Sequence, residues 1–280
     1  MATQRTIEVP TRDIPDALIE SVREKLQHFF VPLIGVSPLG EERRVTFLGS
    51  GTLVRIGEAH CLLTAAHVWN EVRRYGRIMF GTSVRNIGAV MVPPAAIWCR
   101  ERIYESTNGE EWGPDLALLQ FAPTHAGALG ARKSFLDLRQ QQARLAQRPP
   151  RMKKGLWAVT GMVGELSHTT HDERTNTTTA YTNAQAFIGP SEETYDRDGY
   201  DYVDLGVNLK LPGVPQSFGG TSGGGLWQIE VSKKASGEIV WDGELDFRGV
   251  AFWQQRAARG RSRVRCHGPR SVFEMAWARE

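Results

Sequence analysis

Cysteine is scarce in this chain, and the few cysteines show no pattern. There are three among 280 residues, Cys61, Cys99 and Cys266, an odd number without the spacing of metal ligands. A secreted protein of this kind normally carries paired disulfide bridges. We therefore expect a reducing, cytoplasmic compartment in which the three thiols stay unbridged and serve as packing groups.

Long apolar runs and a strong charge of one sign are also missing. No stretch approaches the ~20 apolar residues of a membrane span, and the first residues contain no apolar run of signal-peptide length. The net charge is +3, and the basic segments 139–154 and 256–270 lack the interleaved aromatic residues of a nucleic-acid module. We expect no membrane or nucleic-acid partner, no metal and no cofactor. Both basic segments are expected to be solvated, with contact to a charged partner as the alternative.

The pattern that is present is typical of a chain built mainly from strands. Apolar residues at helical spacing predict a helix over 11–30 that Pro32 stops. From Val31 onward, short apolar stretches alternate with Gly, Pro and Asn, as they do in β proteins. The segment 128–154 is rich in Arg, Gln and Ala and predicts a linker with one short helix over 135–146. The predicted strands lie at 31–36, 45–48, 51–56, 59–64, 78–80, 87–91, 116–121, 155–163, 178–188, 202–209, 225–231, 238–241 and 245–252.

These elements predict two β units of similar size within one domain, which the length allows. The first unit spans 31–127 and the second spans 155–268, on either side of the linker. A helical segment over 1–30 precedes them. A C-terminal helix over 269–280, with proline at its start, follows them.

The glycine-rich run from Ser217 to Trp227 is the strongest candidate for chemistry. Five glycines surround one serine, Ser222, which excludes a regular helix or strand. Such a run can form a tight loop whose backbone N–H groups converge, as a nucleophilic serine requires for the oxyanion formed when a carbonyl is attacked. A plain glycine-rich linker or hairpin loop is the alternative.

Two further residues complete a possible catalytic set. His67 follows a predicted strand and two small alanines, and Asp115 stands at the start of an apolar strand. Taken alone, His67 is more typical of a structural histidine and Asp115 of a turn carboxylate. Together with Ser222 they can form a nucleophile, a general base and an orienting acid.

Three segments carry a family resemblance. Thr64-Ala-Ala-His67, Asp115-Leu-Ala-Leu-Leu119 and Thr221-Ser-Gly-Gly224 resemble the signature segments of the trypsin-like (chymotrypsin-fold) serine peptidases, in that family's order. The scarcity of cysteine makes the chain similar to bridge-free intracellular bacterial members. The resemblance implies an all-β fold, a double six-stranded Greek-key β-barrel with the active site between barrels. It also implies His67 as base, Asp115 as orienter and Ser222 as nucleophile.

The same resemblance implies an oxyanion hole and a substrate pocket. The backbone N–H groups of Gly220 and Ser222 are expected to form the oxyanion hole. The segment Gly249–Trp253 resembles the strand that pairs with substrate, so Phe252, Trp253 and Gln254 are expected to border the pocket, with Gln216 at its floor. An uncharged Gln216 favours an uncharged P1 side chain, the residue preceding the cleaved bond.

Two departures from the family pattern bear on regulation. Thr221 replaces the aspartate that pairs with a new N-terminus after zymogen cleavage, so that switch is absent. Val68 replaces a bridging cysteine. We expect a serine endopeptidase that acts on a polypeptide substrate with restricted processing or regulatory specificity. The alternatives are a catalytically silent binding module on the same fold, or an enzyme that a regulatory protein partner activates.

Other motifs are weaker. His168 and His171 have a spacing that could hold a metal, but their Thr- and Asn-rich segment predicts an exposed hairpin loop. Cys266 and His267 are adjacent, so their side chains are expected to point apart and not to form a dyad. The aspartates form an acidic loop for which solvation is the expected role, with calcium or a basic substrate as alternatives: Asp196, Asp198, Asp201 and Asp204.

Overall fold

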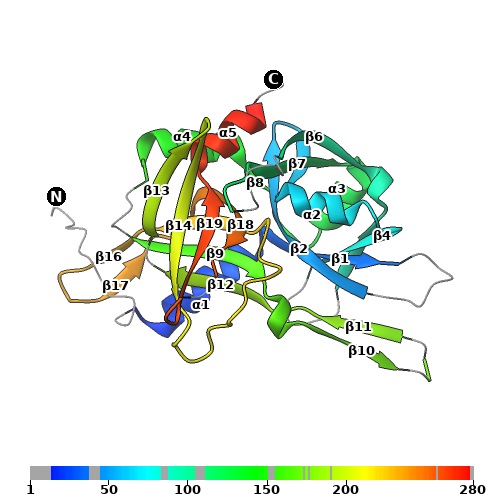
Figure 1. Ribbon diagram of the computed structural model, residues 1–280. Coiled ribbons are helices and arrows are strands. Elements are labelled where there is room, and N and C mark those ends of the chain that lie inside the picture. Colours follow the sequence, from blue (N-terminus) through cyan, green and yellow to red (C-terminus); the bar gives the residue numbers. More distant parts are fainter. Residues whose placement is uncertain are drawn as a thin grey trace.

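The computed structural model describes residues 14–37, 45–82, 88–104, 111–150, 155–172, 174–175, 177–189, 191–256 and 258–277. In these residues the chain is mostly β, with mainly antiparallel sheets and five α-helices (Figure 1). Parts of several predicted elements lie outside the described residues: 1–13, 87, 151–154 and 278–280.

The first large sheet is formed by strands from the N-terminal half. Its order is β5-β4-β1-β2-β3-β7-β6, and the short β8 pairs with β2 in parallel. The strands are β1 (Phe30–Val36), β2 (Val45–Ile56), β3 (Ala59–Thr64), β4 (Arg77–Gly81), β5 (Ala89–Val92), β6 (Ile97–Tyr104), β7 (Asp115–Phe121) and β8 (Leu136–Asp137). The predicted strands 45–48 and 51–56 are one strand, β2, because the intervening Gly49 and Ser50 stay extended and pair with β1.

The second large sheet is formed by strands from the C-terminal half. Its order is β12-β9-β15-β18-β19-β14-β13. The strands are β9 (Leu156–Met162), β12 (Ala184–Gly189), β13 (Ser191–Arg197), β14 (Tyr200–Asn208), β15 (Gly225–Ile229), β18 (Asp246–Gln254) and β19 (Arg261–His267). The sequence pattern missed β13 and β19, because charged residues recur along both and break the apolar runs.

The coarse prediction of a mainly β chain is confirmed, whereas the finer barrel geometry is not. The two sheets contain eight and seven strands, not six each. Among the described residues, neither path of paired strands returns to its first strand.

Two small hairpins stand apart from the large sheets. β10 (His168–Asp172) pairs with β11 (Thr177–Tyr181), and β16 (Val231–Lys233) pairs with β17 (Ile239–Trp241). The predicted strand 178–188 is therefore two strands in different sheets, and 225–231 is likewise divided between β15 and β16. Figure 1 shows the β10–β11 hairpin extending from the body on the side of β1 and β2.

The α-helices pack against strands of the two large sheets. They are α1 (Asp16–Gln27), α2 (Ala66–Val72), α3 (Pro123–Gly130), α4 (Leu138–Gln147) and α5 (Pro269–Trp277), with 3₁₀ turns η2 (Pro94–Ala96) and η3 (Gly164–Leu166). Pro32 does not stop α1, because the helix already ends at Gln27 and Pro32 lies inside β1. The helix predicted in the linker is α4, where the Asp137 carboxylate caps the first turn. Within the described residues, no helix is both long and apolar enough to cross a bilayer.

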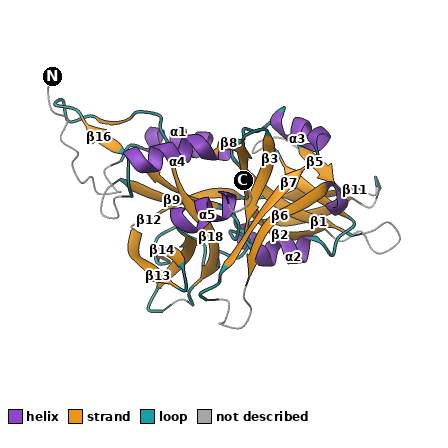
Figure 2. Ribbon diagram, turned by 90° about the horizontal axis from the view of Figure 1, so that it is seen from above, coloured by secondary structure: helices purple, strands orange, loops and turns teal. Residues whose placement is uncertain are grey.

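A buried core joins the two large sheets. Leu63 and Leu116 of the first sheet belong to the same apolar cluster as Ala158, Trp227 and Val250 of the second. Helix α5 packs on β18, β14 and β7, so it also touches both sheets (Figure 2). This shared core fixes the ends of β3 and β7 relative to the loop that precedes β15, where the candidate residues lie.

Candidate active site

His67 is the second residue of α2, directly after β3. The buried Ala65 and Ala66 let the chain turn from strand to helix without a gap. The backbone N–H of His67 donates to Asp115 Oδ1 at 2.8 Å, and its Nδ1 lies 2.5 Å from Asp115 Oδ2. One carboxylate therefore fixes both the backbone and the ring of His67, and it holds the ring proton on Nδ1.

Asp115 is the first residue of β7 and is itself held from behind. Its side chain is 9% exposed, whereas that of His67 is 42% exposed. The backbone N–H of Asp115 donates to Nε2 of His267 at 2.9 Å. The orienting carboxylate is thus buried and anchored, and the His67 ring reaches solvent.

His267 is a residue whose role the sequence did not reveal. Its ring is fully buried against Phe252 and Tyr202, and burial lowers its pKa to about 4 although Asp115 and Asp201 oppose this. Because Nε2 accepts the Asp115 N–H, the neutral ring carries its proton on Nδ1, which has no partner among the described residues. The neighbouring Cys266 packs in a different apolar cluster, so the two side chains do point apart.

Hydrogen bonds fix the orientations of four successive peptide groups in the glycine-rich loop, those that join residues 219 to 223. The carbonyl of Gly219 accepts from Gly164 N–H at 2.8 Å, and that of Thr221 accepts from Gly224 N–H at 2.8 Å. Since N–H and C=O point in opposite directions in a trans peptide, these two bonds direct the N–H groups of Gly220 and Ser222 away from their neighbours. Neither N–H has an acceptor within the described part of the chain.

Two glycines of this loop have backbone conformations that other residues rarely adopt. Gly220 and Gly223 both have φ of +91°. A Cβ on Gly223 would lie 2.0 Å from the carbonyl oxygen of Ser50, and a Cβ on Gly220 would lie 2.9 Å from that of Met162. The loop therefore requires glycine at both positions.

Thr221 closes the turn that carries Ser222. Its N–H and its hydroxyl both donate to the carbonyl of Phe218, at 3.0 and 2.6 Å. The side chain is 4% exposed. Hydrogen bonds within the loop, and no ion pair, therefore hold Thr221 in place.

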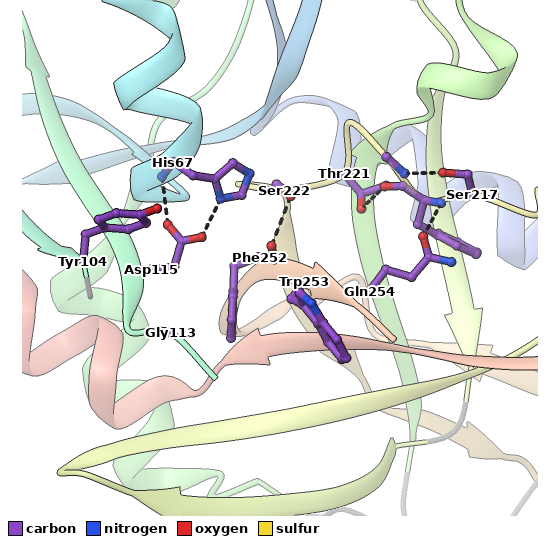
Figure 3. Close-up of a pocket in the computed structure, with 12 residues that line it drawn as sticks. His67, Tyr104, Gly113, Asp115, Ser217, Thr221, Ser222, Phe252, Trp253 and Gln254 are labelled. Carbon is purple, nitrogen blue, oxygen red and sulfur yellow. Dashed lines mark hydrogen bonds and ion pairs between the residues drawn. The ribbon is translucent and has the colours of Figure 1, made fainter. Parts of the chain in front are cut away.

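The hydroxyl of Ser222 makes its hydrogen bond away from His67. It donates to the carbonyl of Phe252 at 3.2 Å, drawn as a dashed line in Figure 3. The His67 ring stands over the same cleft, with Asp115 behind it (Figure 3). The geometry therefore brings the three groups to one cleft, with the serine hydroxyl bonded to Phe252 O.

The cleft has a volume of about 360 Å³ and combines both halves of the chain. It is lined by His67, Tyr104, Gly113, Asp115, Ser217, Phe218, Gly219, Thr221, Ser222, Phe252, Trp253 and Gln254. Of the predicted pocket residues, Phe252, Trp253 and Gln254 line it. Tyr104 was missed: it pairs with Asp115 across β6 and β7 and is 38% exposed. Tyr104 is the last residue of β6, and the apolar pattern does not predict that strand.

Gln216 does not form the floor of this cleft. Its N–H donates to the Glu165 carboxylate at 3.1 Å and its side chain donates to Leu209 O at 3.1 Å, so it belongs to the outer edge of the loop. Gln254 takes the inner position. Its amide oxygen accepts from Phe218 N–H at 2.7 Å, and its amide nitrogen donates to Ser262 Oγ at 3.2 Å. The Gln254 side chain therefore crosses from β18 to the glycine-rich loop.

The weaker motifs do not converge on this site. His168 and His171 lie on the exposed strand β10, not in a loop, and no cluster of three metal-ligating side chains occurs in the described residues. The acidic loop is a strand hairpin in which only Asp198 lies at the turn. Each aspartate has a partner: Asp196 with Arg270, Asp198 with Arg197, Asp201 with Ser271, and Asp204 with Arg265.

Comparisons with known proteins leave the site without a close relative. No protein-family model matches the chain, and no curated protein matches it. One similar solved structure concerns aromatic interactions in the coupled folding and binding of the intrinsically disordered VPg protein of Sesbania mosaic virus. It shares 13% identity at a TM-score of 0.44, over 90% of this chain and 96% of that one. A likeness at this level supports no statement about function.

Proposed function

We propose that the chain is a serine endopeptidase of the trypsin-like fold. The observation that carries the proposal is the two-point contact between His67 and Asp115 on the wall of a cleft that also holds Ser222. The backbone N–H groups of Gly220 and of Ser222 itself have no acceptor within the described residues. A nucleophile, a base with a fixed tautomer and an oxyanion site are the parts that acyl transfer requires.

In the proposed reaction the Ser222 hydroxyl attacks the carbonyl carbon of the scissile peptide bond. Nε2 of His67 takes the hydroxyl proton, and the oxyanion is met by the N–H groups of Gly220 and Ser222. The C–N bond breaks as His67 gives its proton to the leaving amine, which leaves an acyl ester on Ser222. Water then attacks the ester carbonyl as His67 takes its proton, and His67 returns that proton to the Ser222 oxygen as the acid product leaves. Asp115 holds the ring and stabilises its charged form.

The proposal extends to fold, specificity and compartment. Two large sheets with the cleft at their junction support the double-barrel arrangement. The walls beside Ser222 contain no charged side chain in 217–219 or 252–254, which supports an uncharged P1 residue and a restricted, processing-type specificity. All three cysteines lie in described strands and none forms a disulfide, which supports a reducing cytoplasm.

A fluorophosphonate probe tests the proposal without knowledge of the substrate. We expect the folded wild type to be labelled at Ser222, and Ser222→Ala and heat-denatured protein to remain unlabelled. On a cleaved protein substrate, Ser222→Ala is expected to reduce turnover by about 10⁶-fold and Asp115→Asn by about 10⁴-fold. Folded wild type that resists the probe would contradict the proposal.

The hydrogen bond from Ser222 to Phe252 favours a second candidate, a silent or partner-activated binding module on the same fold. In that case the serine is held away from His67 until a partner binds. Labelling that is absent from the isolated chain and appears with a co-purified protein would favour partner activation. Labelling that stays absent, with a partner that protects the cleft, would favour a silent module.

A further inference from the structure

Ser50 links the two halves of the molecule at the glycine-rich loop. It lies in β2 of the first sheet and is 0% exposed. Its backbone N–H donates to Ser222 O at 2.8 Å. Its hydroxyl donates to Gly220 O at 2.6 Å and accepts from Met162 N–H at 2.8 Å. One small side chain thus joins β2, β9 and the loop that carries Ser222.

The flanking glycines allow this close approach. A Cβ on Gly49 would lie 3.1 Å from Ser222 O and 2.7 Å from the Val68 side chain. A Cβ on Gly51 would lie 2.4 Å from the Leu62 side chain. Gly49 therefore leaves room for the loop at Ser222 O, whereas Gly51 leaves room for the side chain of Leu62 in β3.

The bond from the Ser50 hydroxyl acts on the peptide group between the two oxyanion donors. It holds the carbonyl of Gly220, while the Thr221 N–H on the other side of that peptide is held by Phe218 O. This peptide group joins the two peptide groups that carry the N–H groups of Gly220 and Ser222, so holding it limits the orientations that both N–H groups can take. Two hydrogen bonds, one on each side of the peptide group, resist its rotation.

We propose that Ser50 is a positioning residue that keeps the oxyanion site formed in the uncleaved chain. It acts through Gly220 and touches no substrate. This inference rests on the proposed function and adds its regulation: the site needs neither a cleaved N-terminus nor a partner to order the loop. Ser50, in the first half of the chain, holds the loop in place instead.

The test compares Ser50→Ala with Ser271→Ala. Ser271 is a matched control, since it is 2% exposed, donates to the Asp201 carboxylate at 2.6 Å and accepts Asp201 N–H at 2.9 Å, outside the cleft. The first readout is the second-order rate of labelling by a fluorophosphonate, whose phosphoryl oxygen occupies the oxyanion site. The second readout is the proton NMR signal of His67 Nδ1, which reports the contact with Asp115.

We expect Ser50→Ala to slow labelling by about 10- to 100-fold while the His67 signal stays in place. Ser271→Ala is expected to label at the wild-type rate even where its melting temperature falls equally. If Ser50→Ala does not fold, Ser50→Cys keeps a weak donor on a slightly larger side chain, and an intermediate loss is expected.

The inference alone would be overturned by labelling of Ser50→Ala at the wild-type rate, or by an equal slowing in Ser271→Ala. Loss of the His67 signal in Ser50→Ala would also overturn it, since the hydroxyl would then support the whole site. Wild type that is not labelled removes the proposed function, and the inference falls with it.

Discussion

Acidification should destabilise this fold through His267. The ring is fully buried, and its pKa falls from 6.5 to about 4 because burial disfavours the charged form. Between these values the unfolded chain binds a proton that the folded chain does not, so stability is lost as the pH falls from 6.5 towards 4. At 1.36 kcal/mol for each pKa unit, the loss is roughly 3 kcal/mol, a sizeable part of the ~5–15 kcal/mol of a typical domain.

The matched variant is His267→Gln, whose side-chain oxygen can accept the Asp115 N–H but cannot titrate in this range. Urea denaturation of both proteins at several pH values between 7 and 4 gives the free energy of unfolding. We expect the wild type to lose about 3 kcal/mol relative to the variant, because carboxylates shared by both proteins cancel. Two curves that stay parallel across this range would refute the reasoning, since His267 would then titrate alike in both states.

Three further outcomes follow from single contacts. Gln254→Ala removes the side chain that crosses the cleft, so peptide-library cleavage is expected to shift towards larger uncharged P1 residues, and an unchanged profile would exclude Gln254 as a limit on size. Gly224→Ala places a Cβ 1.7 Å from Thr160 O, so it is expected to cost several kcal/mol or prevent folding, as measured by thermal denaturation. A Cβ at Gly57 meets no atom within 4 Å, so Gly57→Ala should lose only about 1 kcal/mol of stability, because of its φ of +56°. Equal losses of stability in Gly224→Ala and Gly57→Ala would contradict the steric argument. Lys133→Met should leave the fold intact at pH 9, because burial already lowers the pKa of this lysine to about 8, and unfolding of the variant there would refute this.

Local sequence could predict those parts of the site in which a residue and its immediate neighbours determine the backbone conformation. The five glycines around Ser222 predict a loop with converging N–H groups, and the two alanines before His67 predict a sharp turn after a strand. The pairing of His67 with Asp115 was predicted from the family resemblance, and the structure brings the two side chains into contact. For the loop and the turn, the residue type and its immediate neighbours carry the information.

The parts that failed depend on contacts distant in sequence. Gln216 was placed by counting back from Ser222, but its side chain donates to Leu209 O and does not line the cleft. His267 reaches Asp115 across 152 residues, through the pairing of β19 with β18 and β14. The Gly49–Gly51 segment looked like a break between two strands, whereas pairing with β1 keeps it extended. No local pattern encodes such long-range pairing.

The hydrogen bonds of Ser50 and Phe252 show which part of the site is already in place and which group must still move. Under the proposed function the Gly220 and Ser222 N–H groups need no rearrangement, because Ser50 holds the loop, whereas the Ser222 hydroxyl is held by a single 3.2 Å bond to Phe252 O. A neutral hydrogen bond of this kind is worth about 1 kcal/mol net. Under the proposed function, a backbone N–H of a bound peptide competes with the Ser222 hydroxyl for Phe252 O, and the freed hydroxyl donates to the exposed His67 ring. Substrate binding and release of the nucleophile are then coupled at a single carbonyl.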